Sequence, residues 1–182
     1  TELNLKHVVI TSVDRDDLPD QGSLQFVEVI KAIREKSPNT IIEVLTPDFQ
    51  GYTNAIDSVI DANPNIFNHN IESIRRLHQF MKPRSNYDRS IDLLKRVKIR
   101  KPEIFTKSGL IVGVGEQVKE VYETMVDLRK VNCDIITLGQ YIQPPGNVLE
   151  VKEYIHPNQF KEYSLKAKKL GFKFVASGPL VR

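Results

Sequence analysis

Short apolar runs alternate with amphipathic stretches along the whole chain. Six runs are short and rich in β-branched or apolar residues, as strands covered on both faces are, and they fall at 7–13, 41–45, 65–70, 104–112, 134–141 and 172–176. Between them, apolar residues recur at the three- and four-residue spacing of a helix face. This alternation predicts parallel strands joined by right-handed crossovers.

Two of the predicted helices have defined starting points. Ser23 is placed to cap the first helix. The strand at 65–70 is expected to run directly into a helix whose apolar face is formed by Ile71, Ile74 and Leu77. The other helical faces fall at 55–60, 91–97, 118–128 and 160–167.

The length narrows the choice of architecture. A complete (β/α)8 barrel uses about 250 residues, or about 31 per unit, so a chain of this length corresponds to about six units. The 182 residues therefore predict an α/β fold, either an open doubly wound sheet or an incomplete barrel, with 1–182 forming a single domain. In both architectures ligands bind at the C-terminal ends of the strands.

Composition excludes several classes of protein. No apolar run approaches the roughly 18–20 residues of a membrane-spanning helix, so we expect no membrane span. A net charge of +3, spread along the chain, does not indicate a nucleic-acid partner. The one cysteine, Cys133, excludes a metal site held by several thiolates of this chain and is expected to be a small core residue.

Polar side chains follow several of the predicted strands. Asp14, Asp16 and Asp17 can bind a divalent cation, or they can pair with Arg15 and cap the next helix. In 68–72 (NHNIE), amide and carboxylate groups two residues apart can bind adjacent hydroxyls of a ribose or sugar. The alternative is that the histidine is a satisfied core residue and the asparagines close a turn.

The fourth strand adds weaker signals. Gly113 and Gly115 follow it, but Val118 occupies the third position of a dinucleotide-binding GxGxxG pattern. Lys107 and Ser108 can hold a carboxylate or phosphate, or the lysine can lie at a strand edge. The residues alone therefore indicate an α/β domain with a polar cleft for a nucleoside-like ligand, and no reaction.

Six strand-end segments together resemble one family. They are VITSVDRDDLPDQG (9–22), EVLTPDFQG (43–51), FNHNIES (67–73), TKSGLIVGVGE (106–116), TLGQYIQP (137–144) and SGPLVR (177–182). In this order and spacing they resemble lipoyl synthase, a member of the radical S-adenosylmethionine (SAM) superfamily. The resemblance covers essentially the whole chain.

The resemblance implies a partial (β/α)6 barrel of the radical SAM type, incomplete here at its N-terminal side. The implied enzyme is a sulfurtransferase of lipoate biosynthesis, which inserts two sulfur atoms at C6 and C8 of a protein-bound octanoyl group. Its implied cofactors are SAM and, in the full-length enzyme, two [4Fe–4S] clusters. Its implied partners are octanoylated lipoyl carrier domains or the glycine-cleavage H protein, in the bacterial cytoplasm, or in a mitochondrion or plastid of a eukaryote.

The chain also departs from the family pattern. The family's two cysteine triplets, and a serine that follows the C-terminal arginine, are not in the sequence. We therefore expect a fragment that carries no cluster, no metal ligand and no catalytic residue, and that is inactive by itself. Pro145-Gly146-Asn147-Val148 replaces a usually basic stretch and is expected to change the substrate-side contacts of that loop.

Residue by residue, the resemblance implies a SAM site. Asn70 and Glu72 would bind the ribose hydroxyls, and either Arg89 or Lys107 would pair with the methionyl carboxylate. At the end of the first strand, the methionyl amino group would meet Thr11, Ser12 and Asp14. The adenine would lie along the fourth strand, at Ser108, Ile111 and Gly113. After the fifth strand, Tyr141 and Gln143 would face the cleft.

Two interpretations from other classes remain open at this point. The chain can be a stand-alone α/β module that binds a nucleoside or sugar in the same cleft without redox chemistry. It can also be a complete non-radical barrel enzyme such as an aldolase, with Lys107 as its Schiff-base lysine.

Overall fold

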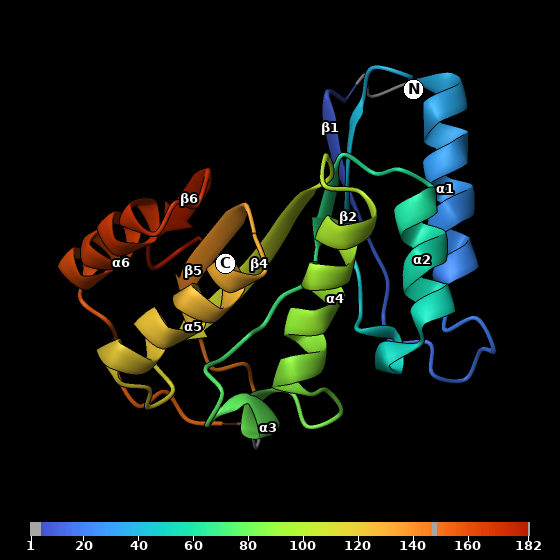
Figure 1. Cartoon of the computed structure of the whole chain (residues 1–182). Helices are drawn as coiled ribbons and strands as arrows, with labels where there is room; N and C mark the ends of the chain where they lie inside the picture. Colours follow the sequence, from blue (N-terminus) through green and yellow to red (C-terminus); the bar gives the residue numbers. More distant parts are fainter. Residues whose placement is uncertain (1–4, 147–148, 182) are drawn as a thin grey trace.

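Six parallel strands form one curved sheet in the computed structural model, which describes residues 5–146 and 149–181 (Figure 1). The strands are β1 (His7–Thr11), β2 (Ile41–Leu45), β3 (Ile66–Asn68), β4 (Phe105–Val112), β5 (Ile135–Gln140) and β6 (Phe174–Ser177). The helices are α1 (Ser23–Lys36), α2 (Thr53–Asp61), α3 (His78–Met81), α4 (Tyr87–Arg100), α5 (Val118–Lys130) and α6 (Pro157–Lys169), with a 3₁₀ turn, η1, at Phe49–Gly51.

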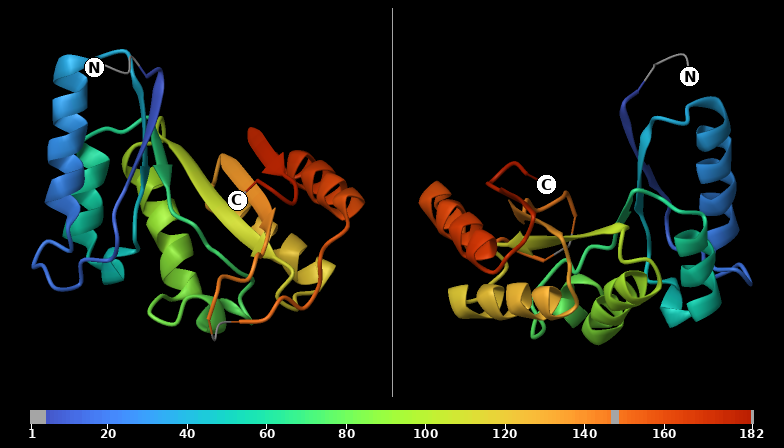
Figure 2. Two further views of the ribbon diagram at one scale, coloured as in Figure 1. Left: turned by 180° about the vertical axis from the view of Figure 1, so that it is seen from behind. Right: turned by 45° about the horizontal axis from the view of Figure 1, so that its top comes forward.

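The order of the strands decides between the two predicted architectures. The described strands pair as β1-β2-β3-β4-β5-β6, so each strand lies beside its neighbour in the chain. Right-handed crossovers between strands in sequential order place the helices on one face, the convex side of the sheet (Figure 2). A doubly wound sheet would reverse its order at a switch point. The doubly wound alternative is therefore wrong, and the partial barrel is confirmed.

Each strand divides its side chains between the helical layer and the concave face. In β2, Ile42 and Val44 are buried in the hydrophobic core under the helices, whereas Glu43 and Leu45 alternate with them and face the concave side. Phe67 of β3 and Leu138 of β5 continue the same core. The two-residue period thus leaves the concave face to carry polar groups near the strand ends.

The prediction that a helix follows β3 directly is wrong. Glu72 has φ of 63°, which a helix does not allow, and it forms an isolated parallel bridge with Leu110 of β4. The backbone N–H of Glu72 donates to the Gly109 carbonyl (3.0 Å), and that of Ile111 donates to the Glu72 carbonyl (2.8 Å). Ile71 and Ile74 are buried and Leu77 is partly buried, but the chain pairs with β4 at Glu72 instead of forming a helix, and the helix begins only at His78.

The cap of the first helix also differs from the prediction. Helix α1 begins at Ser23, and its N-cap is Gly22, with φ of 77°. A carboxylate oxygen of Asp20 accepts from the backbone N–H of Leu24 at 2.9 Å. An aspartate three residues earlier therefore supplies the acceptor that was assigned to the serine.

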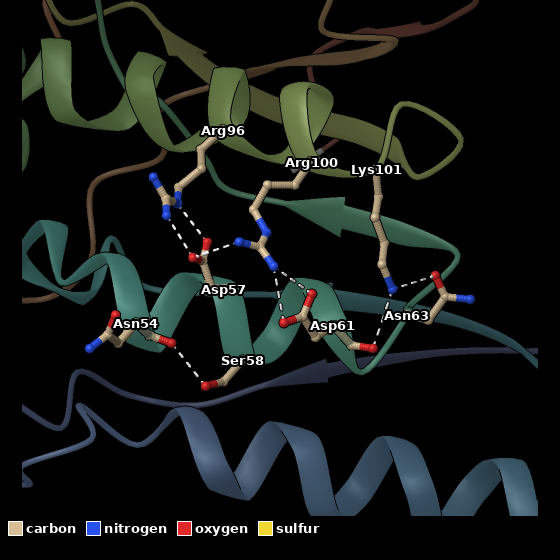
Figure 3. Close-up of polar contacts among 8 residues, drawn as sticks. All are labelled: Asn54, Asp57, Ser58, Asp61, Asn63, Arg96, Arg100 and Lys101. Atoms are coloured by element: carbon tan, nitrogen blue, oxygen red, sulfur yellow. Dashed lines mark hydrogen bonds and ion pairs between the residues drawn. The ribbon is translucent and has the colours of Figure 1, made fainter.

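Helices α2 and α4 are joined by a network of ion pairs (Figure 3). Arg96 donates to both carboxylate oxygens of Asp57 at 2.5 and 2.6 Å, and Arg100 donates to Asp57 at 2.9 Å. Arg100 also contacts the more exposed Asp61 at 2.9 Å. The hydrogen bond from Arg96 is the main reason why the pKa of Asp57 lies below its usual value.

We expect Asp57→Asn to lower the free energy of unfolding by about 1 kcal/mol at neutral pH, because a two-point contact with arginine is lost. Since the folded-state pKa of Asp57 is depressed, its contribution is complete above the unfolded pKa of about 3.9 and disappears as the pH falls through the folded value. Urea unfolding at about pH 7 and about pH 2 should therefore show the difference only at the higher pH. Asp61→Asn, at a side chain 56% exposed, is the control and should change stability little at either pH.

Candidate functional site

A small cavity opens where β1, β2 and β3 end. Its volume is about 180 Å³, and the residues that line it are Thr11, Ser12, Asp14, Leu45, Thr46, Pro47, Asn70, Glu72 and Lys82. Five of the residues predicted from the sequence lie here together, from β1 and from the segment after β3: Thr11, Ser12, Asp14, Asn70 and Glu72. The position at the C-terminal ends of parallel strands is the one expected for ligands in such folds.

The strand ends hold the cavity walls in place. The Thr11 hydroxyl donates to the Leu45 carbonyl at 3.0 Å, which ties the last residues of β1 and β2 together. The backbone N–H of Thr46 donates to the Asn68 carbonyl at 3.0 Å. The lining residues therefore come from backbone that is fixed by neighbouring strands.

Ser108 supports the segment that carries Asn70 and Glu72. Its buried hydroxyl accepts from the backbone N–H of Ile71 at 3.0 Å. Ser108 lies on the helical side of β4, between the core residue Leu110 and the buried Thr106. Its side chain is therefore engaged within the fold. Neither Ser108 nor Ile111 lines the cavity, although the backbone N–H of Ile111 donates to the carbonyl of the lining residue Glu72.

The two candidate cations of the predicted site are both paired elsewhere. Arg89 of α4 contacts Asp48 at 2.8 Å and also donates to the Arg84 carbonyl. Lys107 of β4 contacts the buried Glu43 at 2.8 Å on the concave face. Neither is among the residues that line the cavity.

Gly113 and the residues after β5 do not line the cavity. They lie where the end of β4 meets the loop that follows β5. A Cβ atom on Gly113 would meet the Gln140 side-chain nitrogen at 2.2 Å and the Glu153 carbonyl at 2.5 Å. The Tyr141 hydroxyl donates to the Leu149 carbonyl at 2.7 Å. Gln143 is exposed. The missing Cβ at Gly113 thus admits a neighbouring loop of the same chain.

The remaining sequence candidates are also placed. Arg15 pairs with Asp17 at 2.7 Å, in agreement with the ion-pair interpretation of the aspartate cluster. Cys133 is buried in the core as expected, and burial raises its pKa to about 12. No three His, Cys, Asp or Glu side chains gather as a metal site within 5–146 and 149–181. The departure at Pro145–Val148 falls partly on residues 147–148, outside the described residues.

Lys82 is the lining residue that the sequence did not reveal. It follows the four-residue helix α3 and precedes Pro83, ten positions beyond Glu72. Its ammonium nitrogen lies 3.4 Å from the Nε2 atom of His69, which is buried behind the cavity. Burial lowers the pKa of Lys82, and burial lowers the pKa of His69 to about 3. Only the fold of 71–81 brings this lysine to the strand ends.

Comparison with known proteins agrees with this geometry. The family model of the radical SAM superfamily matches residues 1–128, well over half of the chain. The chain therefore belongs to the radical SAM superfamily.

Several lipoyl synthases are about half identical to this chain. That of Caldanaerobacter subterraneus subsp. tengcongensis is 51% identical over 180 residues, which are 99% of this chain and 63% of that protein. The lipoyl synthase of Flavobacterium psychrophilum is 49% identical and that of Caldicellulosiruptor bescii 51% identical, each over 99% of this chain and 62% of the relative. The chain thus spans less than two thirds of the length of these relatives.

A solved structure supports the fold. The crystal structure of methylornithine synthase (PylB) superposes with a TM-score of 0.65 over 93% of this chain and 49% of that one, at 12% sequence identity. At this identity the likeness concerns the fold alone. Among the described residues, no helix has the length and hydropathy needed to cross a membrane.

Proposed function

We propose that this chain is the barrel body of a lipoyl synthase. The parent enzyme would be a sulfurtransferase that inserts two sulfur atoms, at C6 and C8 of a protein-bound octanoyl group. The observation that carries this proposal is the identity of about half of all positions with lipoyl synthases across nearly the whole chain. The cavity supports it, because Thr11, Asn70 and Glu72, which the family resemblance implies for SAM, line it together.

The side chains around the cavity fit a nucleoside that carries an amino-acid group. Asn70 and Glu72 offer amide and carboxylate oxygens that accept hydrogen bonds from ribose hydroxyls. Asp14 at the end of β1 offers a negative charge to an ammonium group. Since drug-sized ligands fill about 300–1,000 Å³, a cavity of about 180 Å³ can enclose only part of SAM.

SAM together with a reduced [4Fe–4S] cluster supplies hydrogen-atom abstraction from an unactivated carbon. The part of the chain that the structure describes contains one thiol, which is buried, and no cluster of three possible metal ligands, so it does not fit a [4Fe–4S] cluster. We therefore assign to these residues the binding and orientation of SAM, with the cluster ligands on residues that this chain does not contain. Tyr141 and Gln143 remain proposed contacts at the mouth of the barrel.

The wider setting of the enzyme is part of the same proposal. Its acceptors would be octanoylated lipoyl carrier domains or the glycine-cleavage H protein, and we place it in the cytoplasm of a bacterium because the lipoyl synthases it resembles come from bacteria. Residues 1–182 would act as one domain, because one sheet and one hydrophobic core run from β1 to β6.

A chimera tests the proposed function directly. The matching 180 residues of the Caldanaerobacter lipoyl synthase would be exchanged for this chain, and octanoylated H protein would be assayed by mass spectrometry for two added sulfur atoms. We expect sulfur insertion, and its loss on Glu72→Ala with the protein still folded. A folded chimera that carries its clusters and binds SAM but adds no sulfur would overturn the proposal.

The 182-residue chain by itself is expected to hold no [4Fe–4S] cluster, because such a cluster needs about four thiolate or equivalent ligands. Cys133, the one cysteine, is buried and its pKa is raised to about 12, which disfavours the thiolate. Reconstitution with iron and sulfide, followed by visible absorption and iron analysis, checks this. One cluster per chain would contradict the assignment of ligands.

The aldolase alternative can be tested in the same preparation. The side-chain nitrogen of Lys107 lies 2.8 Å from a carboxylate oxygen of the buried Glu43, so it is engaged in an ion pair and is not positioned to attack a carbonyl ligand. Borohydride treatment with carbonyl ligands is expected to leave Lys107 unmodified.

A further inference from the structure

We propose that Lys82 is the group that binds a ligand carboxylate in the cavity at the ends of β1–β3, and that His69 is the positioning residue that holds its ammonium group there. The inference rests on the proposed function for the identity of the ligand, which is a nucleoside with an amino-acid portion. It assigns to Lys82 the role for which Arg89 and Lys107 are the candidates in the sequence.

Lys82 is the cation among the residues that line the cavity. The other charged lining residues, Asp14 and Glu72, are carboxylates. An ammonium group beside two carboxylates matches a zwitterionic ligand, whose carboxylate and ammonium groups need partners of opposite sign. The same lining offers oxygen acceptors to ribose hydroxyls, so one cavity serves both parts of the ligand.

Lys82 has no direct ion pair within the part of the chain that the structure describes; Asp48, Glu72 and Asp14 attract its ammonium group at longer range, and burial still lowers its pKa. Among the described residues, no carboxylate oxygen lies within 4.0 Å of its ammonium nitrogen. Asp48, which follows the lining residue Pro47 in the chain, is occupied by Arg89 at 2.8 Å and by the Ser85 hydroxyl at 2.7 Å. Because the desolvation of this half-buried ammonium group outweighs these attractions, a carboxylate bound directly to it would stabilise its charged form.

Arg89 and Lys107 are in the opposite situation. Each has a carboxylate partner at 2.8 Å, Asp48 and Glu43 respectively. Binding a ligand carboxylate would require either cation to leave a partner that is itself largely buried. That exchange would leave Asp48 or Glu43 without its main cation, so Lys82 is the better partner for a new anion.

His69 fixes the position of the ammonium group. Its Nδ1 atom lies 2.9 Å from the Thr46 carbonyl, which can only accept, so Nδ1 carries the proton. Its Nε2 atom therefore accepts, from the Ser90 hydroxyl at 3.0 Å and from Lys82 at 3.4 Å. Because burial keeps the imidazole uncharged at neutral pH, the histidine orients the lysine without repelling it.

Two ligands that differ only in the carboxylate test the assignment. SAM and decarboxylated SAM would be titrated calorimetrically into the 182-residue chain. We expect the wild type to prefer SAM by about tenfold, the scale of one hydrogen bond to a charged group. Lys82→Met should abolish the preference and leave the affinity for decarboxylated SAM within about twofold, while Lys82→Arg keeps a preference. Lys130→Met, at an exposed lysine of α5, is the control.

Paired substitutions separate the positioning role of His69 from a structural one. His69→Asn keeps a donor near the Nδ1 position and loses the acceptor for Lys82, whereas His69→Gln keeps an acceptor near the Nε2 position. We expect His69→Asn to reduce the preference for SAM several-fold and His69→Gln to retain it. If either variant fails to fold, the Lys82 variants still decide the proposal.

The possible failures are distinguishable. A preference for SAM that survives Lys82→Met would overturn the assignment of Lys82, while nucleoside binding that depends on Glu72 would leave the proposed function standing. Absence of binding by both ligands would overturn this inference, while sulfur insertion by the chimera would still decide the proposed function. An equal loss of SAM preference in His69→Asn and His69→Gln would overturn the role of His69 alone.

Discussion

Gly113→Ala is expected to lower the free energy of unfolding by about 3 kcal/mol or more. Two causes add. The φ of Gly113 is 101°, a backbone conformation that alanine rarely adopts, and the new Cβ would meet the Glu153 carbonyl at 2.5 Å. The backbone carbonyl of Gly113 also accepts from the N–H groups of Lys152 and Glu153, so the clash would displace the segment that packs on it.

Gly146→Ala is the matched control for this prediction. Gly146 has a φ of 114°, and a Cβ there would meet nothing within 4 Å. Only the conformational cost remains, and we expect about 1 kcal/mol. Urea unfolding of both variants gives the comparison. Equal losses of stability would mean that the close contact between the 152–153 segment and Gly113 does not contribute to the effect of Gly113→Ala.

Glu43→Ala is expected to cost about 3 kcal/mol, at the lower end of the values for breaking a buried ion pair. The buried carboxylate contacts Lys107 at 2.8 Å, and it accepts from Asn68 at 2.9 Å. Its removal leaves the ammonium group of Lys107 on the concave face without this partner. Because Lys107 is 23% exposed, water offsets part of the loss.

A double substitution shows whether the cost comes from the unpaired charge. Glu43→Met with Lys107→Met removes both charges and should recover most of the stability, since apolar replacements of buried pairs are often neutral. Glu28→Ala, in an exposed pair of α1, is the control and should cost less than about 0.5 kcal/mol. A double variant as unstable as Glu43→Ala alone would show that packing, rather than charge, explains the loss.

The strands could be predicted from the sequence because each is a short apolar run between turn residues. The run at 41–45 matches β2 without change, and 104–112 differs from β4 by one residue. Their order could not be predicted, because alternation of strand and helix is common to open sheets and barrels. The prediction of a helix at 71–77 failed for another reason: the apolar residues there have helical spacing, but Glu72 pairs with β4. Tertiary contact overrode local pattern there.

The site was partly predictable on the same grounds. Residues at the ends of neighbouring parallel strands must lie close together, so Thr11, Asp14 and Asn70 were correctly expected to meet. The sequence did not predict which cation is available to bind a ligand carboxylate. Whether Arg89 or Lys107 is available depends on Asp48 and Glu43, residues 41 and 64 positions away, and only the folded chain shows these pairs.

The most direct test of the SAM site is a chemical-shift map of the isotope-labelled 182-residue chain titrated with 5′-deoxyadenosine. NMR detects weak binding, so the absence of a cluster does not prevent the measurement. The shifts are expected to concentrate at the cavity residues, above all Thr11–Asp14, Asn70 and Glu72. Glu72→Ala should weaken them throughout. Shifts confined to the apolar opposite end of the concave face, around Phe105 and Phe174, with no change at Asn70 or Glu72, would contradict the assignment.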